Sequence, residues 1–150
     1  MRTIARIGIA AALVAGVSLE AQAQAKPDVL VAQRQAAMKL QGKYLGPIGA
    51  MLKGAAPYNA DIVARNATFL ENLSRMPWDG FDPSTQGEKS KAKPEIYKEM
   101  AKFKAAADTL EAEASKLGAA ARAKDEAGVR ATFGGVAKAC GSCHDTFREK

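Results

Sequence analysis

The chain ends with Cys140-Gly141-Ser142-Cys143-His144-Asp145-Thr146-Phe147-Arg148-Glu149-Lys150, which contains both cysteines and the only histidine of its 150 residues. A Cys-x-x-Cys-His pattern is typical of c-type haem attachment, in which two thiols bond the two vinyl groups and the imidazole ligates the iron. On a helix, Cys140 and Cys143 lie about one turn apart on one face, with His144 beside them. The stretch therefore predicts one covalently attached haem, with Cys140 and Cys143 as thioether donors and His144 as an axial iron ligand.

Three other interpretations of these residues fit less well. A redox-active dithiol explains the two cysteines but not the adjacent histidine, and it ordinarily lies in a βαβ setting, of which the sequence gives no sign. A structural zinc site needs four ligands, and the chain has no further cysteine or histidine. A disulfide between residues three apart on a helix has poor geometry.

The attachment motif lies on a longer apolar stripe, and a second stripe precedes it. Both stripes repeat at intervals of three and four residues, which is the pattern of a seam in a helix bundle. No stretch alternates with a period of two, so we predict no sheet. The stripes comprise Val129, Phe133, Val136, Cys140, Cys143 and Phe147, and Ile96, Met100, Phe103, Ala107, Leu110, Ala114 and Leu117.

Two further helices precede these stripes. The first begins at Lys26-Pro27-Asp28, and Gly46-Pro47 should kink or interrupt it before it stops at residue 53. The second begins after Asn59, a favourable N-cap residue, and ends before Pro77. Four helices joined mostly by short loops predict an all-α fold, an antiparallel up-down-up-down four-helix bundle with a covalent haem near the C-terminal helix.

One connection is long. Residues 77–94 are rich in Gly, Pro and polar residues, and a loop of this length in a compact domain usually has a function of its own or some disorder. We expect Trp78 and Phe81 to pack over the end of the bundle. Pro94-Glu95 should start the third helix, and Gly118 should end it.

The N-terminal segment has the features of a secretory signal peptide. A basic start with Arg2 and Arg6 precedes an apolar run at residues 7–17, and Ala21-Gln22-Ala23 supplies small residues for cleavage. An anchor helix is the alternative, but the run is too short to span a bilayer. We therefore predict a cleaved signal peptide at residues 1–23 and a single domain at residues 24–150. A cut after Ala25 is a second possible site.

The charges of the chain do not indicate a nucleic-acid partner. Removing Arg2, Arg6 and Glu20 from 22 basic and 16 acidic residues leaves 20 and 15, a net charge of +5. These charges are scattered rather than clustered, as on an ordinary solvated surface. A mildly basic protein could favour acidic redox partners, and after processing we expect neither nucleic-acid nor membrane association.

The sequence resembles the cytochrome c′ family, the class II c-type cytochromes. The resemblance extends over essentially the whole chain after the signal peptide, and its motifs occur in the family's order. They are Arg34-Gln35 with an apolar residue three beyond, Lys53-Gly54-x-x-Pro57-Tyr58, Pro77-Trp78 with Phe81, Lys93-Pro94-Glu95-Ile96-Tyr97, and Cys140-x-x-Cys143-His144-x-x-Phe147-Arg148.

The resemblance implies roles for residues outside the attachment motif. Arg34 would approach a haem propionate and Gln35 would line the pocket beside it, although both residues would also suit an exposed polar face of the first helix. Arg148 would tune the proximal histidine, or else complement the helix dipole. Lys93 is a further candidate for contact with a propionate.

Met38 lies four residues after Arg34, so it shares that face of the first helix and should point at the distal side of the haem. High-spin members of the family have a non-bonding side chain here, which leaves a five-coordinate iron open to NO or CO. Low-spin relatives bring a methionine sulfur onto the iron instead. We expect the open site, with six-coordinate His144/Met38 electron transfer without gas binding as the alternative.

The resemblance thus predicts haem c, electron transfer to redox partner proteins, and NO or CO binding, in the periplasm of a Gram-negative bacterium. Export suits the motif, because thioether attachment of haem is expected outside the bacterial inner membrane. A peroxidase would need a distal acid–base group, and the only histidine is already committed to the iron, so we expect no enzyme activity. Many relatives are homodimers through the first two helices, which suggests a surface around Leu45, Ile48, Met51 and Leu52.

Overall fold

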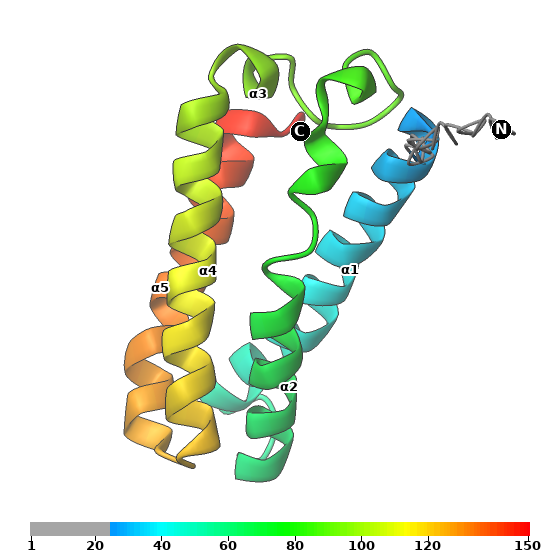
Figure 1. Ribbon diagram of the computed structural model, residues 1–150. Coiled ribbons are helices and arrows are strands. Elements are labelled where there is room, and N and C mark those ends of the chain that lie inside the picture. The colour runs from blue at the N-terminus through cyan, green and yellow to red at the C-terminus, as the bar shows by residue number, and fades with distance from the viewer. Residues whose placement is uncertain (1–24) are drawn as a thin grey trace, which may run out of the picture.

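The computed structural model describes residues 25–150, and the predicted signal peptide lies outside these residues. Four long helices run up and down in an antiparallel bundle, as predicted (Figure 1). They are α1 (Pro27–Leu52), α2 (Ala60–Leu73), α4 (Met100–Arg122) and α5 (Glu126–Phe147). The segment between α2 and α4 contains the 3-10 turns η1 (Asp79–Phe81) and η2 (Pro83–Thr85) and the short helix α3 (Glu95–Lys98).

Helix α1 is continuous, which corrects the predicted interruption at Gly46-Pro47. Pro47 lacks an N–H and so leaves the carbonyl oxygen of Lys43 without its helical donor. Both residues are exposed, so water can take the place of the missing donor. The helix therefore passes through a proline without ending.

Helix α2 begins as predicted, because the Asn59 side chain accepts hydrogen bonds from the N–H groups of Asp61 and Ile62 at 3.1 and 3.0 Å. The third long helix differs from the prediction at both ends. Glu99 leaves helical geometry, with φ −118° and ψ 42°, so Pro94-Glu95 starts only α3 and α4 begins at Met100. Gly118 lies inside α4, where a β-carbon would collide with the carboxylate of Glu71 on α2.

We call the end of the bundle where α1 ends and α5 begins the closed end. Side chains from all four long helices meet in its core, as the spacing of three and four residues predicts. Most of these side chains have no measurable exposure or only a few per cent. The core contains Ile48, Met51, Val63, Ala67, Leu70, Leu110, Leu117, Ala121, Val129, Val136 and Ala139.

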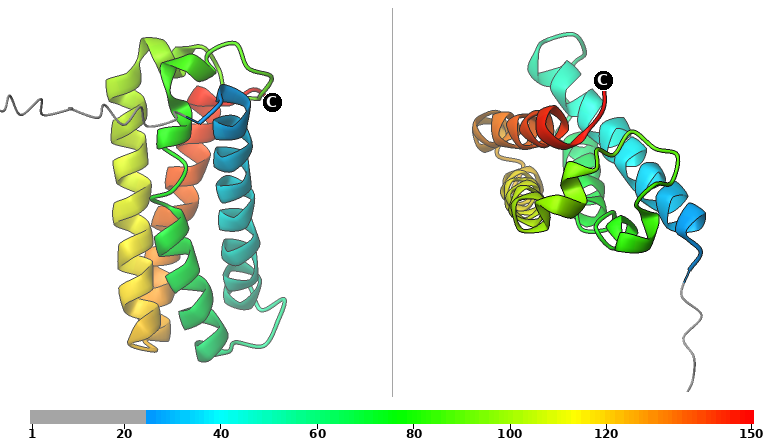
Figure 2. Two further views of the ribbon diagram at one scale, coloured as in Figure 1. Left: turned by 45° about the vertical axis from the view of Figure 1, so that its right-hand side comes forward. Right: turned by 90° about the horizontal axis from the view of Figure 1, so that it is seen from above.

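We call the opposite end the open end, and the segment between α2 and α4 covers it (Figure 2). Its core is a separate aromatic cluster. Phe81 and Phe147 both pack edge-on against Phe103, with ring centroids 4.7 and 5.3 Å apart. Trp78 packs against Phe103 at 5.8 Å, so Trp78 and Phe81 pack over this end as predicted.

The C-terminus is held at the open end by the chain that precedes α3. The Lys93 N–H donates to the Phe147 carbonyl oxygen at 3.0 Å, and the Glu149 N–H donates to Lys91 at 2.8 Å. A single antiparallel bridge joins Ala92 to Arg148. These bonds fix the end of α5, the helix that carries the attachment motif.

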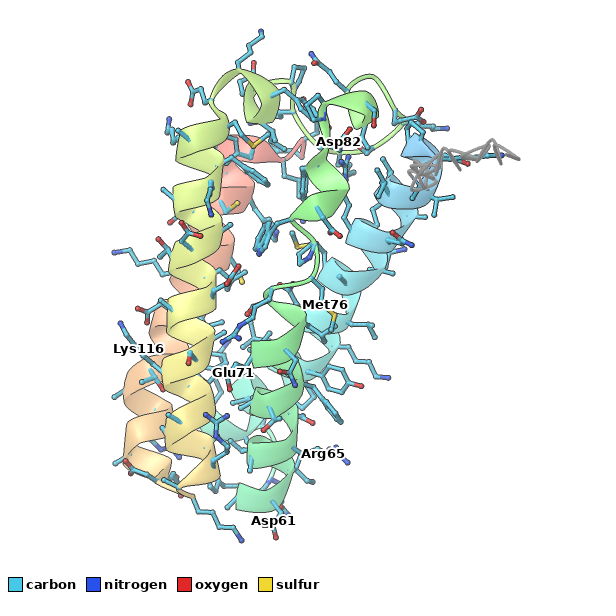
Figure 3. All side chains as sticks on the ribbon, in the orientation of Figure 1. Asp61, Arg65, Glu71, Met76, Asp82 and Lys116 are labelled. Atoms are coloured by element: carbon cyan, nitrogen blue, oxygen red, sulfur yellow. The ribbon has the colours of Figure 1, made fainter. Side chains whose placement is uncertain are left out.

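The exposed apolar surface is not the one expected from the sequence. Ile48 and Met51 are buried in the closed-end core, because the face of α1 that bears them turns inward. Large apolar side chains are exposed instead on neighbouring parts of α1 and α2. They are Leu40 and Phe69, with Met76 just after α2 (Figure 3).

None of the helices in residues 25–150 is both long enough and apolar enough to cross a membrane.

Candidate haem site

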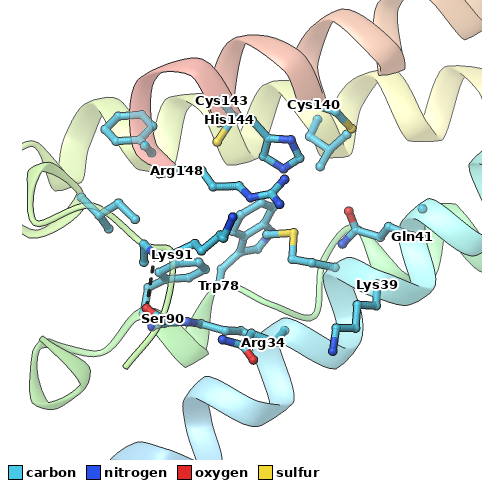
Figure 4. Close-up of a pocket in the computed structure, with 18 of the residues that line it drawn as sticks. Arg34, Lys39, Gln41, Trp78, Ser90, Lys91, Cys140, Cys143, His144 and Arg148 are labelled. Atoms are coloured by element: carbon cyan, nitrogen blue, oxygen red, sulfur yellow. Dashed lines mark hydrogen bonds between the residues drawn. The ribbon is translucent and has the colours of Figure 1, made fainter. Parts of the chain in front are cut away.

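A cavity of about 610 Å³ opens between α1 and the C-terminal half of α5 (Figure 4). Its volume lies within the range of about 300 to 1,000 Å³ that is usual for small-molecule and cofactor sites. The attachment motif forms one wall, and α1 forms the facing wall. The segment before α3 and the helix α4 supply further aromatic and aliphatic lining.

Cys140, Cys143 and His144 all line this cavity, so the structure brings the three motif residues to one site. Both cysteines are free thiols and half-buried. Burial raises the pKa of each thiol above its ordinary value of 9.0, and the neighbouring Cys140 raises that of Cys143 further. Both side chains therefore carry their protons at neutral pH and are held about one helical turn apart.

The His144 ring projects from α5 into the cavity, and the Arg148 guanidinium lies close to it (Figure 4). Burial, followed by the positive charge of Arg148, lowers the pKa of His144 below its ordinary value of 6.5, and Asp145 opposes this shift. The imidazole is consequently neutral at neutral pH, which is the form that binds iron. Arg148 thus lies on the proximal wall, where the sequence predicts it.

Arg34 is buried, with 3% of its surface exposed, so it does not belong to an exposed polar face. Its guanidinium donates to the Gly80 carbonyl oxygen, to Thr85 Oγ1 at 3.0 Å and to Ser90 Oγ at 3.1 Å. It also lies over the Phe81 ring, 4.3 Å from the centroid. Arg34 therefore orders the segment that covers the open end.

The loop approaches Arg34 very closely, which explains the glycine at position 80. A β-carbon at Gly80 would lie 2.8 Å from Arg34 Cβ and 2.9 Å from the Leu30 carbonyl oxygen. No acidic side chain within residues 25–150 forms an ion pair with Arg34. A buried cation without a counter-ion is unfavourable, so the site is suited to a ligand that supplies negative charge.

Gln35 and Met38 also line the cavity from α1. Gln35 is exposed, so it lies at the mouth of the cavity. Met38 is half-buried and packs against the aromatic cluster at the open end. The predicted distal residue therefore does face the motif across the cavity.

Lys93 does not line the cavity. Its ammonium group donates to the carbonyl oxygens of Asp145 and Thr146, each at 3.3 Å. These carbonyls belong to the last turn of α5, where a cation complements the helix dipole. The contacts of Lys93 are those of a residue that holds the end of α5.

The lining fits a haem in three ways. It is mostly apolar, as a porphyrin requires. Its charged groups are all basic (Arg34, Lys39, Lys91 and Arg148), and this suits the two propionates of a haem. The Trp78 indole N–H is buried without a hydrogen-bond partner, so an acceptor brought by a bound group would satisfy it.

Sequence reasoning missed several residues of this lining. Lys91 and Ser90 come from the long loop, and no periodic pattern places a loop residue at a cavity. Lys39 lies next to Met38 at the cavity edge. Gln41 is buried and lies three residues after Met38. That spacing puts Gln41 on the same face of α1 and was a signal that could have found it.

Comparisons with known proteins agree with this geometry. The family described as Cytochrome C′ matches residues 29–148. Cytochrome c′ of Alcaligenes xylosoxydans xylosoxydans is 40% identical over 126 residues, covering 84% of this chain and 98% of that protein.

Two solved structures are similar over nearly their full lengths. Cytochrome c′ from Rubrivivax gelatinosus superposes with a TM-score of 0.80 at 38% identity, covering 83% of this chain and 98% of that one. A nitric oxide complex of a mutant cytochrome c′ from Alcaligenes xylosoxidans superposes with a TM-score of 0.78 at 40% identity, covering 84% and 98%.

The bundle, the cavity and the Cys-x-x-Cys-His wall define a c-type haem protein of the four-helix class. The chain belongs to the cytochrome c′ family, whose cofactor is covalently attached haem c. The resemblance inferred from the sequence motifs is thereby confirmed.

Proposed function

We propose that the protein carries electrons through a single haem c held by Cys140 and Cys143, with His144 as the axial ligand of the iron. The observation that carries this proposal is the position of all three residues on one wall of an apolar cavity. When bound, the haem supplies the redox-active iron. The chain supplies two thiols, a neutral imidazole and an apolar enclosure that excludes water from most of the porphyrin.

The distal side of the iron is open in this proposal and binds NO or CO. Met38 then serves as packing, in keeping with its contact with the aromatic cluster. A further support is that a related bundle has been solved as a nitric oxide complex. The six-coordinate His144/Met38 alternative is not favoured by these relatives.

Absorption spectra of the reduced holoprotein, with and without CO, test the open site. We expect a broad high-spin Soret band that shifts when CO is added. A sharp low-spin α band that stays unchanged when CO is added would contradict the proposal. The Met38→Ala variant adds a second test, because its CO-free spectrum should match the wild type if the sulfur does not bind iron.

Two basic residues and one amide complete the proposed site. Arg34 binds a propionate through its positive charge, which no acidic side chain among the described residues neutralises. Gln35 lies beside it at the mouth of the cavity. Arg148 tunes His144, whose pKa its charge already lowers. Lys93 acts on the last turn of α5 rather than on a propionate, as its two carbonyl contacts indicate.

We further propose that residues 1–23 are a signal peptide and that the domain at residues 24–150 works in the periplasm of a Gram-negative bacterium. N-terminal sequencing of the exported protein would test this, with Gln24 or Lys26 as the expected first residue. A carrier and ligand-binding role requires no catalytic residue, so we assign none. Its redox partners are proteins that exchange electrons with the haem.

The proposed homodimer forms through the exposed apolar side chains of α1 and α2. Phe69 is 42% exposed although it packs against Tyr44, with ring centroids 4.9 Å apart, and Leu40 is 39% exposed. Light scattering after gel filtration should give twice the chain mass, and Phe69→Lys should give the monomer. The Val29→Lys variant is a matched control, since Val29 is equally exposed near the start of α1.

A further inference from the structure

One buried side-chain amide, that of Gln41, lies in the distal wall of the cavity. Only 5% of Gln41 is exposed, although the side chain lines the cavity. Its Nε2 donates to the carbonyl oxygen of Leu73, the last residue of α2, at 2.9 Å. A carbonyl oxygen can only accept, so this bond fixes which end of the amide is the nitrogen.

The oxygen of the same amide consequently faces the cavity. In Figure 4 it points across the cavity toward the part of α5 that bears Cys140 and His144. Gln41 Oε1 has no hydrogen-bond donor within residues 25–150 and is not sealed in the protein interior. Gln41 Oε1 is thus a fixed hydrogen-bond acceptor without a donor among these residues. It lies about one helical turn beyond Met38 on the same face of α1.

The surroundings of Gln41 strengthen the electrostatic effect of this oxygen. The neighbouring lining is apolar, with Leu45 and Leu70 among its members, and a polar group acts more strongly in such surroundings than in water. Arg34 is the other buried polar side chain of α1 in the lining, whereas Gln35 and Lys39 lie at the exposed mouth. Gln41 is therefore the buried uncharged polar side chain that α1 contributes to this wall.

We propose that Gln41 is a specificity-determining residue of the distal side, where its carbonyl oxygen favours small neutral ligands that can donate a hydrogen bond, water first, and disfavours anions. The proposal rests on the open site described above. A lone pair held near the ligand attracts an O–H group and repels a second lone pair or a negative charge. The apolar neighbours disfavour an anion by desolvation, and the oxygen of Gln41 adds a direct repulsion to this cost.

The test uses the holoprotein and the Gln41→Met variant, which keeps the volume and removes the amide. The infrared C–O stretch of the ferrous CO complex reports the local field, and a nearby negative oxygen raises its frequency. We expect the stretch to fall in Gln41→Met. We also expect the affinity of the ferric protein for azide to rise about threefold to tenfold, the effect of one hydrogen-bond-sized interaction.

Two further variants make the test specific. Gln41→Glu retains an acceptor at this position, so its CO stretch should equal or exceed that of the wild type. Gln35→Met removes an amide from the mouth and should change neither measurement. The Leu73 carbonyl keeps a second donor, the Met76 N–H at 3.2 Å, so Gln41→Met is expected to fold.

The outcomes separate this inference from the proposed function. If Gln41→Met binds CO with an unshifted stretch and azide with unchanged affinity, Gln41 does not face the ligand and the inference is wrong. If the wild type forms no CO complex at all, both the open site and the role of Gln41 are wrong. A lower stretch and tighter azide binding confined to Gln41→Met support the inference.

Discussion

The closed and open ends of the bundle use the same helical spacing but enclose different interiors. At the closed end, Ile48, Val63 and Leu117 show no exposed surface and belong to the core shared by the four long helices. At the open end, α5 and α1 are separated by a cavity of about 610 Å³, and aromatic rings form the core beside it. Apolar periodicity alone therefore does not distinguish a filled core from a cofactor site.

The difference lies in the polar groups that accompany each interior. Beside the closed-end core, Glu71 of α2 (Figure 3) makes a part-buried contact with Ser115 and an exposed contact with Arg122, both on α4. The open end instead buries Arg34 and Gln41 and leaves the Trp78 N–H without a partner. Buried polar groups without protein partners of opposite charge mark the end that receives a ligand.

The largest effect is expected from removing the two thiols of the open end. Changing Cys140 and Cys143 together to serine should abolish covalent haem, because a hydroxyl is not expected to replace a thiol in forming the bond to a vinyl group. Denaturing electrophoresis with haem staining measures this directly. Ser142→Ala, between the two thiols, is the control and should stain as the wild type does. Staining of the double variant would contradict the proposed attachment.

At the closed end, Leu117→Ala should lower the free energy of unfolding by about 2 to 5 kcal/mol, the usual cost of a leucine-sized deletion in a packed core. Leu117 has no exposed surface, so its neighbours have little freedom to close the void. Urea titration of the holoprotein measures the change. The haem spectrum should stay unchanged in the folded variant, and a spectral shift would show that the two ends are not independent.

Glu71 links α2 to α4 and provides a smaller effect. It accepts hydrogen bonds from Arg122 at 2.5 Å and from Ser115 Oγ at 3.0 Å. The Arg122 hydrogen bond holds the pKa of Glu71 below its ordinary value of 4.5. Because Arg122 is half-exposed, Glu71→Gln should cost only about 0.5 to 1 kcal/mol.

The pH dependence of this effect has a definite sign. A carboxyl group whose pKa is lowered by folding stabilises the protein fully above its ordinary pKa and loses this contribution as the pH falls through the folded value. The stability difference between wild type and Glu71→Gln should therefore be constant near neutral pH and shrink below pH 4.5. A difference that grows on acidification would contradict the assignment. Urea midpoints at several pH values measure it.

The smallest effect is expected at Lys93. Lys93→Met removes the ammonium group from the carbonyls of Asp145 and Thr146 and should cost about 0.3 to 1 kcal/mol. Amide hydrogen exchange at Arg148 and Glu149 should become faster, because the end of α5 loses this restraint. Lys89→Met, at an exposed position of the same loop, is the control. Equal exchange rates in the two variants would show that Lys93 does not restrain the end of α5.

The sequence predicted those features whose cause is local. The Asn59 cap and the placement of Cys140, Cys143 and His144 on one face follow from residues a few positions apart. Predictions failed where a distant residue decided the outcome. Helix α4 continues through Gly118, where the missing β-carbon leaves room for the carboxylate of Glu71 on α2.

The two walls of the cavity show the same division between local and long-range causes. By itself, the sequence determined the family and the contiguous motif on α5, because the spacing of Cys140, Cys143 and His144 is set by one helix. Only the tertiary structure decided that Arg34 is buried under the loop, that Lys93 holds the end of α5 and that Gln41 turns its oxygen to the cavity. Each of these depends on a partner more than thirty residues away, which helical periodicity does not encode.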